Sequence, residues 1–522
     1  MTVKTATIET LPDPDHTEVI AFLSDPESYP GAVRSIDVVE THAARVFLTG
    51  NDAFKIKKAV TLPYLDFGTL EQRKTACEYE LRINQPHAPE IYLDVIAITR
   101  DADGGLAFDG SGKPVEWVLR MRQFPDDSLL GDLIRDDRLT IEFADCLADE
   151  IVRYQSEAPM VRDQGAGARM VAIVDELCSA FDEAAGLLPT PDVRRFAKAA
   201  KATLHACCGL LDERGRQGYV RRCHGDLHLS NILALNGRPV LFDAIEFNDE
   251  IATVDVLYDL AFLLMDLGHV GQYGYANRIL NRYLSRSGNE HHLSGLQALP
   301  LFMACRAGVR AMVAVTRLQQ SSTNGKPGDA AEDAKAYLSQ ANAYLMSPRP
   351  RLIAVGGLSG TGKTSLARAL AARLVPCPGA VHLRTDVERK QLFGVGETTR
   401  LPAETYTRNV SDAVYERVLR KAGVTLQTGH PVIVDAVFLD PAERSAIEQI
   451  ANDAGVPFAG LWLEADEECL VERVSNRTGD ASDATEAVVR KQSERCAGQL
   501  NWHRISAGGA LEETISRSLD VL

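Results

Sequence analysis

The chain of 522 residues lacks the features that mark several classes of protein. Its 10 cysteines are scattered and form no CxxC pair, so neither a zinc site nor a disulfide framework is indicated. The N-terminus has no apolar signal core. The longest apolar run, near Val256 to Leu267, is interrupted by Asp259 and Asp266, which predicts a buried helix and not a membrane span. We therefore expect a protein of the cytoplasm with reduced thiols.

The chain also lacks an excess of positive charge. It has 72 acidic and 56 basic residues, and the net charge of -16 argues against non-specific binding to nucleic acid or anionic membrane. Hydrophobic content of 45% and charged content of 25% are typical of a soluble globular protein. We find no internal repeat, and the length suggests about three or four folding units. The oligomeric state stays open.

The periodicity of the sequence divides the chain into three segments. Residues 1–125 alternate short strands with one helix, and residues 126–346 are mainly helical around a strand hairpin at about 220–247. Residues 347–522 alternate strand and helix, which is the layout of a parallel sheet wrapped by helices. The break is placed at Ser347-Pro348-Arg349-Pro350.

The string His-Gly-Asp-Leu-His-Leu-Ser-Asn at residues 224–231, followed by Leu-Phe-Asp at 241–243, has a spacing used in phosphoryl transfer. Kinase catalytic loops use such an Asp to accept a hydroxyl proton, and such an Asn and a second Asp to hold metal. Asp226 is therefore a candidate catalytic carboxylate, and Asn231 and Asp243 are candidate Mg²⁺ ligands. The alternative is that Asp226 and Asn231 only cap a turn.

A metal-bridged ATP also needs a cationic anchor on a nearby strand. Lys55 and Lys57 qualify and share a strand face, and we slightly favour Lys57. Glu80 is the predicted carboxylate partner, with Glu78 as the alternative. Either lysine could instead end a solvated strand, and Glu80 could lie on a surface helix. Glu246 has two interpretations of equal weight: its side chain contacts metal or substrate, or it is an ordinary carboxylate of a turn.

The strand at 116–121 is predicted to lead into a hinge. Backbone groups from Met121 to Gln123 could meet adenine there. These two residues complete the candidate nucleotide contacts of the first site.

A second motif, Gly-Leu-Ser-Gly-Thr-Gly-Lys-Thr at residues 357–364, lies between a predicted strand and a predicted helix. Backbone N–H groups of such a loop cradle phosphate, the lysine reaches the outer phosphates and the threonine offers its hydroxyl to Mg²⁺. The candidate nucleotide-binding residues are Gly357, Ser359, Gly360, Thr361, Gly362, Lys363, Thr364 and Ser365. Asp435 ends a later apolar strand and is a candidate metal ligand, with a turn carboxylate as the alternative.

The first motif resembles the aminoglycoside phosphotransferase-like branch of the kinase fold, over about residues 30 to 315. The resemblance implies a two-lobed α+β protein-kinase-like fold and transfer of phosphate to a small-molecule hydroxyl. The chain departs from the kinase pattern because no G-x-G-x-x-G loop precedes Lys57, and Thr41-His42-Ala43-Ala44 stands in that turn. Phosphate cover should be short there, so the choice between ATP and GTP stays open.

The second motif resembles gluconate, shikimate and zeta-toxin-type kinases, over about residues 350 to 522. The resemblance implies that Asp386 orients the acceptor and that Arg473 and Arg477, four residues apart on one helix face, belong to a closing lid. The alternatives are a helix cap for Asp386 and a solvated helix face for the arginines. The tandem order resembles bacterial proteins in which an aminoglycoside phosphotransferase-like part is fused to a P-loop kinase.

These patterns together predict a tandem ATP- and Mg²⁺-dependent phosphotransferase acting on a sugar, amino sugar or related metabolite. Two alternatives remain, a nucleotide-sensing regulatory ATPase and a kinase acting on a protein. A complete Asp226, Asn231 and Asp243 set disfavours the sensor, and the lack of an Ala-Pro-Glu segment after Asp243 disfavours a protein kinase. The regions expected to contact the acceptor, about 255–310 and 397–415, carry no recognisable code.

Overall fold

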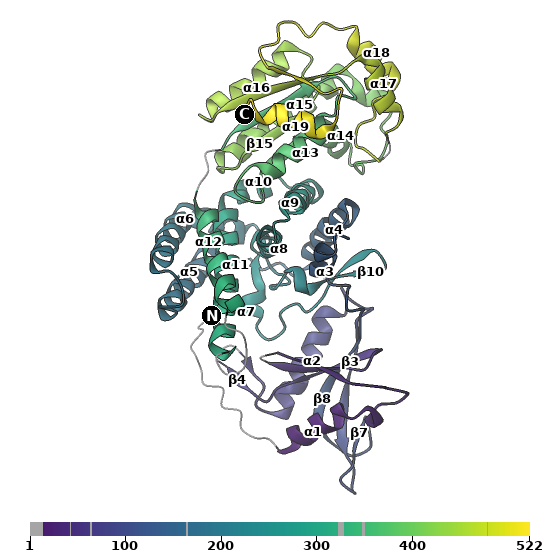
Figure 1. The fold of residues 1–522 in the computed structure, drawn as a ribbon, viewed down its shortest axis with the longest axis vertical. Helices are drawn as coiled ribbons and strands as arrows, with labels where there is room; N and C mark the ends of the chain where they lie inside the picture. The colour runs from purple at the N-terminus through teal and green to yellow at the C-terminus, as the bar shows by residue number, and fades with distance from the viewer. Residues whose placement is uncertain are drawn as a thin grey trace. The chain divides into compact units, whose positions relative to one another are not determined.

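The computed structural model describes residues 14–41, 43–62, 65–162, 165–321, 328–346, 350–477 and 479–522 (Figure 1). The chain divides into two compact units, the first made of residues 1–188 and 211–263 and the second of residues 189–210 and 264–522. Most of the proposed break at 347–350 lies outside the described residues. The three-segment division by sequence therefore stays a prediction.

A six-stranded antiparallel sheet organises the N-terminal part of the first unit. In sheet order the strands are β1 (Asp37–Glu40), β2 (Ala44–Leu48), β3 (Asp52–Lys57), β8 (Lys113–Arg122), β6 (Tyr92–Arg100) and β7 (Leu106–Phe108). Helix α1 (Pro14–Ser24) packs with one set of buried strand side chains, and α2 (Leu70–Asn84) packs with another. A small hairpin, β4 (Thr61–Leu62) and β5 (Leu65–Asp66), precedes α2.

Alternation along β3 decides where its lysines point. Phe54 and Ile56 join the cluster that contains α1 residues. Lys55 and Lys57 therefore point to the other face, toward α2. Helix α2 begins with a capping box in which Thr69 and Gln72 satisfy each other's backbone N–H groups. The sequence prediction that both lysines share one face is confirmed.

The rest of the first unit is helical around a short hairpin. Its elements are α3 (Leu130–Arg135), α4 (Ile141–Glu157), α5 (Ala166–Glu183), β9 (Val220–Arg222), β10 (Ile232–Leu235), β11 (Arg238–Leu241), α7 (Asp249–Ala252) and β12 (Thr253–Asp255). Two long helices, α6 (Thr190–Arg216) and α8 (Val256–His269), each contribute to both units. The predicted buried helix is α8, in which Leu257, Leu260 and Leu263 are fully buried.

The second unit contains α9 (Tyr273–Ser287), α10 (His291–Gly295), α11 (Leu299–Ser321) and α12 (Gly328–Leu345) before the P-loop part. Within the described ranges, one helical stretch, His291–Gln319, is long and apolar enough by composition to cross a membrane. Because 78% of its most apolar window is buried inside the structure, it has the character of a core helix.

Five parallel strands form the sheet of the P-loop part. In sheet order they are β14 (Val381–Arg384), β15 (Val432–Asp435), β13 (Leu352–Gly357), β16 (Phe458–Glu464) and β17 (His503–Ser506). The helices are α13 (Lys363–Arg373), α14 (Thr385–Leu392), α15 (Arg408–Gln427), α16 (Pro441–Asp453), α17 (Glu467–Ser475), α18 (Glu486–Ser493) and α19 (Leu511–Leu519). Central β13 is buried throughout, and its Ile353 and Val355 pack with α13 and α19 residues. The carboxyl ends of β13, β14 and β15 share one edge, where ligands bind in sheets of this kind.

The predicted fold class is confirmed. The chain combines a protein-kinase-like α+β part, with its sheet, following helix and β10–β11 hairpin, and an α/β P-loop part with a parallel sheet.

Candidate active sites

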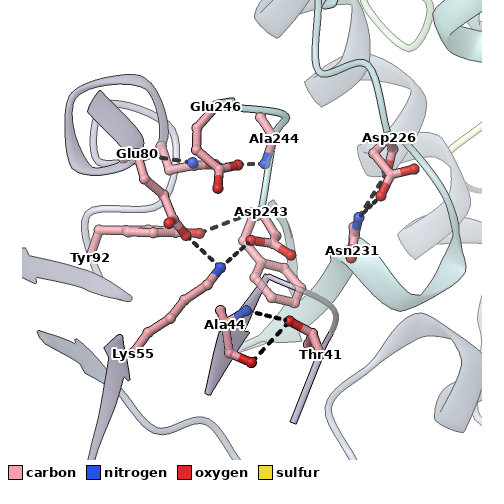
Figure 2. A network of polar contacts seen from close by, with 12 residues as sticks. Thr41, Ala44, Lys55, Glu80, Tyr92, Asp226, Asn231, Asp243, Ala244 and Glu246 are labelled. Carbon is pink, nitrogen blue, oxygen red and sulfur yellow. Dashed lines mark hydrogen bonds and ion pairs between the residues drawn. The ribbon is translucent and has the colours of Figure 1, made fainter. Parts of the chain in front are cut away.

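The first candidate site is centred on the loop between β9 and β10. The Nδ2 of Asn231 donates to the Asp226 Oδ2 at 2.9 Å and to the Asp226 carbonyl at 3.0 Å (Figure 2). His228 Nε2 lies 3.2 Å from the same carboxylate oxygen. The Asp226 side chain keeps 38% of its surface exposed, so an acceptor can reach it. Asp226 and Asn231 thus form one directly bonded pair.

Asp259 holds this loop from the interior. Its Oδ1 accepts the N–H of Gly225 at 2.8 Å, and its Oδ2 accepts from Gln155 Nε2 at 3.2 Å. His224 lies 2.9 Å from the Phe242 carbonyl through Nε2, which ties the loop to the following hairpin. Asp259 is fully buried on α8, where sequence reasoning saw only an interruption of an apolar run. A carboxylate within an apolar run that predicts a buried helix was the signal that could have marked it.

Asp243 follows the hairpin in the left-handed region, with a φ of +59°. Its N–H donates to the Tyr92 hydroxyl at 3.1 Å, and the next N–H, of Ala244, donates to Asn84 Oδ1 at 2.9 Å. Its side chain is 42% exposed and faces Lys55 (Figure 2). Asp243 and Asn231 provide carboxylate and amide oxygens of the kind that Mg²⁺ prefers.

Lys55, and not Lys57, lies between the two predicted partners. The Lys55 ammonium is 2.7 Å from Glu80 Oε1 and 2.9 Å from Asp243 Oδ1 (Figure 2). The Lys57 ammonium is 2.5 Å from Glu80 Oε2 and 2.5 Å from Glu246 Oε1, with only 1% of its side chain exposed. The slight preference for Lys57 as phosphate anchor is therefore corrected, because the side chains of Lys57 and its partner Glu246 are only 1% and 10% exposed, whereas the Asp243 beside Lys55 is 42% exposed. Neither lysine ends a solvated strand.

The buried charges shift one another's pKa values. Burial would lower the pKa of Lys55, but Asp243 and Glu80 outweigh it and hold this pKa well above its usual value. Burial would raise the pKa of Glu80, but Lys55 and Lys57 lower it to about 2. Burial raises the pKa of Glu246 despite the nearby Lys57. Three carboxylates thus face two ammonium groups, and this negative excess suits a divalent cation.

The predicted hinge has fewer free backbone N–H groups for adenine than the sequence suggested. Met121 lies inside β8 and pairs with both β3 and β6. The N–H of Arg122 donates to the Ile91 carbonyl at 2.7 Å, and the N–H of Gln123 donates to the Asn51 carbonyl at 2.9 Å. These two N–H groups are therefore used inside the protein, and adenine contact through the other backbone groups from Met121 to Gln123 stays a prediction.

The turn between β1 and β2 is tight. The N–H of Thr41 donates to the Ala44 carbonyl at 2.9 Å, and Thr41 Oγ1 accepts the N–H of Ala44 at 3.0 Å (Figure 2). The N–H of Lys58 donates to the Ala43 carbonyl at 2.8 Å. His42 of the predicted turn lies outside the described residues. The expected short phosphate cover agrees with this closed turn.

The second candidate site is built on the loop between β13 and α13. Gly360 has a φ of +90°, and a Cβ there would lie 2.6 Å from the Leu470 carbonyl, so only glycine fits. Lys363 Nζ donates to the Leu358 carbonyl at 2.9 Å, which curls the loop around the ammonium. The loop residues that line the adjoining cavity of about 1490 Å³ are Ser359, Gly360, Gly362, Lys363, Thr364 and Ser365. The other two predicted residues, Gly357 and Thr361, are buried and shape the loop from behind.

Thr364 and Asp435 meet as the sequence predicted. Thr364 Oγ1 donates to Asp435 Oδ2 at 2.5 Å, at the end of β15. Burial would raise the pKa of Asp435, but His382, Lys363 and Arg384 hold it below its usual value. An ionised carboxylate beside a hydroxyl fits Mg²⁺. Arg384 was missed by sequence reasoning, and its guanidinium lies 2.7 Å from Asp480 Oδ1.

Asp386 lines the same cavity from the first turn of α14. The N-cap of that helix is Arg384, so the helix-cap alternative for Asp386 is wrong. Burial raises the pKa of the Asp386 carboxyl. A carboxylate with a raised pKa is better suited to accept a proton near neutral pH.

The two predicted lid arginines do not share a helix face. Helix α17 ends at Ser475, so Arg477 lies beyond it, which corrects the sequence prediction. Arg473 donates through Nη1 to the Ala507 carbonyl at 2.8 Å, and so it is held by the segment after β17. Arg477 lines the cavity with its Nε 4.0 Å from Asp480 Oδ2. Both arginines line the cavity, but only Arg473 is fixed by a main-chain carbonyl.

Comparisons with known proteins match either the P-loop part or most of the chain. A family model described as an AAA domain matches residues 352–498. The Mycobacterium tuberculosis (strain ATCC 25618 / H37Rv) protein named Uncharacterized protein Rv2004c is 32% identical over 495 residues, which cover 93% of this chain and 95% of that relative. The chain belongs to the same family as Rv2004c.

Other similarities of this member of the Rv2004c family are shorter or more distant. An adenylyl-sulfate kinase of Myxococcus xanthus (strain DK1622) is 33% identical over 118 residues, covering 22% of this chain and 59% of that one. A solved choline/ethanolamine kinase family protein from Mesorhizobium loti is 14% identical, with a TM-score of 0.38, covering 63% of this chain and 99% of that one.

Proposed function

We propose that this chain is a tandem ATP- and Mg²⁺-dependent phosphotransferase whose acceptors are small-molecule hydroxyl groups. The observation that carries the proposal is the first site, where Lys55 joins Glu80 to Asp243 and Asp226 is bonded to Asn231. Phosphoryl transfer needs little from a protein beyond a cationic anchor, oxygen ligands for metal and an acceptor carboxylate. The partial match to a relative named adenylyl-sulfate kinase supports a small-molecule acceptor.

In the first site Asp226 accepts the proton of the acceptor hydroxyl while that oxygen attacks the γ-phosphorus. The bond between the γ-phosphorus and the bridging oxygen breaks, and ADP leaves. When ATP binds, the Lys55 ammonium leaves Asp243 and contacts a phosphate group. Its positive charge then offsets the negative charge of the phosphates. Asn231 and Asp243 would hold Mg²⁺, which would supply positive charge close to the phosphates. Glu80 keeps the lysine in place.

In the second site the roles fall to different residues. Lys363 meets the outer phosphates, and Arg477 adds positive charge from the cavity wall. Thr364 and Asp435 would hold Mg²⁺. Asp386, with its raised pKa, accepts the acceptor proton. A cavity of about 1490 Å³ has room for a nucleotide and a metabolite together.

The acidic composition supports the further proposal that nucleic acid and membrane are not partners, and that the protein works in the cytoplasm. The 10 cysteines form no CxxC pair in the sequence, which supports the proposal of a reducing compartment.

The proposal is tested by incubating the protein with Mg²⁺, γ-labelled ATP and a fractionated cytosolic metabolite extract. Asp226→Ala and Lys363→Ala are run in parallel, with thermal unfolding of each variant as the folding control. Label in a small molecule that one variant loses assigns the activity to that site, and loss in both indicates coupled sites. Wild-type protein that binds ATP but labels no metabolite refutes the proposal, and label on a protein instead would identify a protein kinase.

A further inference from the structure

Helix α9 covers the open edge of the P-loop sheet within the second unit. Strand β14 is an edge strand, so one side of its backbone has no neighbouring strand. Asn277 Nδ2 donates to the Pro378 carbonyl at 2.7 Å and to the Ala380 carbonyl at 2.9 Å, in the segment that leads into β14. One helical turn later, Asn281 Oδ1 accepts the N–H of His382 at 2.7 Å. Two side-chain amides on α9 thus make hydrogen bonds to this edge that a neighbouring strand would otherwise make.

The same helix face reaches the segment that follows α14. Asn277, Asn281 and Ser285 are spaced by four residues and therefore lie along one face of α9. Ser285 Oγ donates to Glu397 Oε1 at 2.7 Å, and the guanidinium of Arg282 lies 3.0 Å from Glu397 Oε2. Both oxygens of Glu397 are therefore held by α9.

Glu397 is three positions before a wall of the cavity. Residues 400–403 line the cavity, as does Asp386 at the start of α14. The segment is also held by Lys390 of α14, which donates to the Thr399 carbonyl at 2.5 Å, and by Asp483, which lines the cavity and accepts the N–H of Leu401 at 3.0 Å. Helix α14 therefore carries both the acceptor carboxylate and a lysine that holds the segment leading into this wall. Helix α9 holds the same segment through Glu397.

We propose that α9 is a positioning element of the second site, in which Arg282 and Ser285 hold Glu397 and thereby fix the acceptor-side wall at residues 400–403. The inference rests on the proposed function, because it takes this wall to face the acceptor. It means that the second site needs a helix that precedes the P-loop part in sequence. A wall displaced by even about 1 Å weakens acceptor binding and orientation without touching the nucleotide.

The test uses the full chain with Asp226→Asn to silence the first site. Arg282→Met and Glu397→Gln are compared with Glu290→Gln, which removes the ion pair between Glu290 and Arg420 of α15, two residues outside the segment 394–403. Transfer of label from γ-labelled ATP is measured over a dilution series of the active metabolite fraction, and separately over ATP concentration. Hydrogen–deuterium exchange of residues 394–403 is followed in the same four proteins.

We expect Arg282→Met and Glu397→Gln to raise the half-saturating amount of extract about fivefold or more, with the half-saturating ATP concentration changed less than about twofold. Exchange at 394–403 should become faster in both, and Glu290→Gln should change none of these. An equal rise in the ATP requirement, or an equal effect of Glu290→Gln, would overturn the inference and leave α9 with a general stabilising role. Unchanged values in both variants would overturn it as well.

If the parent protein labels no metabolite, the function proposed for the second site fails, and the exchange measurement alone decides the inference. Faster exchange confined to 394–403 in Arg282→Met and Glu397→Gln then upholds the support by α9, and unchanged exchange refutes it. The exchanged-charge double variant Arg282→Glu with Glu397→Arg should recover most of the protection, which a loss of global stability would not predict.

Discussion

The two candidate sites hold their lysines by different physical means. Lys55 sits between the carboxylates of Glu80 and Asp243, whereas Lys363 donates to a main-chain carbonyl, that of Leu358. Acidic neighbours hold the pKa of Lys55 well above its usual value against the effect of burial, whereas burial lowers the pKa of Lys363. The lysine of the first site is thus held by side-chain ion pairs, and the lysine of the second by a main-chain carbonyl. The first should respond most to removed charges, and the second to altered backbone.

The largest expected effect is on first-site catalysis. Asp226→Asn keeps the size of the side chain and its bond to Asn231 but removes the proton acceptor. We expect first-site kcat to fall by roughly 10² to 10⁴, the range typical of general bases. Transfer assigned to the second site should keep its rate, measured with labelled ATP in the background of an intact Lys363. A first-site rate within threefold of wild type would remove Asp226 from the proposed role.

A second prediction separates the two lysines of β3. Lys57→Met should lower the free energy of unfolding by about 3–5 kcal/mol, because it leaves Glu80 and Glu246 as buried carboxylates that share one positive neighbour fewer. Lys55→Met should destabilise the protein less, since its partner Asp243 is 42% exposed, yet it should abolish first-site transfer. Denaturant unfolding and label transfer on both variants give the comparison. The reverse order of stabilities would restore Lys57 as the phosphate anchor.

The third prediction concerns pH. The pKa of Glu80 is lowered from its ordinary value of 4.5 to about 2 in the folded protein, so its ion pairs contribute stability that is fully present above about pH 4.5. That contribution is lost as pH falls from about 4.5 toward 2, because the unfolded state takes up the proton first. The loss should amount to about 3 kcal/mol at most. Glu80→Gln should flatten the dependence in this window when unfolding is followed at several pH values, and an unchanged slope would contradict the assignment.

The sequence predicted the features that depend on local pattern, such as which residues share a strand face. It did not predict which side chains meet when their contacts depend on segments far apart in the chain. Alternation placed Lys55 and Lys57 on one strand face, but which of them meets Asp243 depends on a hairpin 188 residues away in the chain. The sequence pattern predicted that Thr364 and Asp435 would meet, because Thr364 follows β13 and Asp435 ends the neighbouring parallel strand β15. Helix α17 ends before Arg477, and a main-chain carbonyl holds Arg473. Both features depend on tertiary packing, which the periodicity of the sequence does not reveal.

The same distinction explains the missed residues. Asp259 and Arg384 act on the candidate sites through partners in other elements, Gly225 and Asp480. Asp259 is one of two aspartates in α8 and Arg384 stands at the end of a strand, and neither belongs to a spacing motif. Their roles became visible only when burial and hydrogen-bond partners were known together.

The smallest expected effect belongs to the backbone of the second site, and it completes the comparison. Gly360→Ala places a Cβ 2.6 Å from the Leu470 carbonyl at a φ of +90°, whereas the same change at Gly362, with a φ of +86°, meets no atom within 4 Å. Both variants bear the strain of a positive φ, about 1 kcal/mol, but only Gly360→Ala must also displace α17. We expect second-site ATP binding, measured by titration calorimetry, to weaken more in Gly360→Ala than in Gly362→Ala, with the first site unaffected in both. Equal losses would mean that φ alone, and not the contact with Leu470, sets the geometry of this loop.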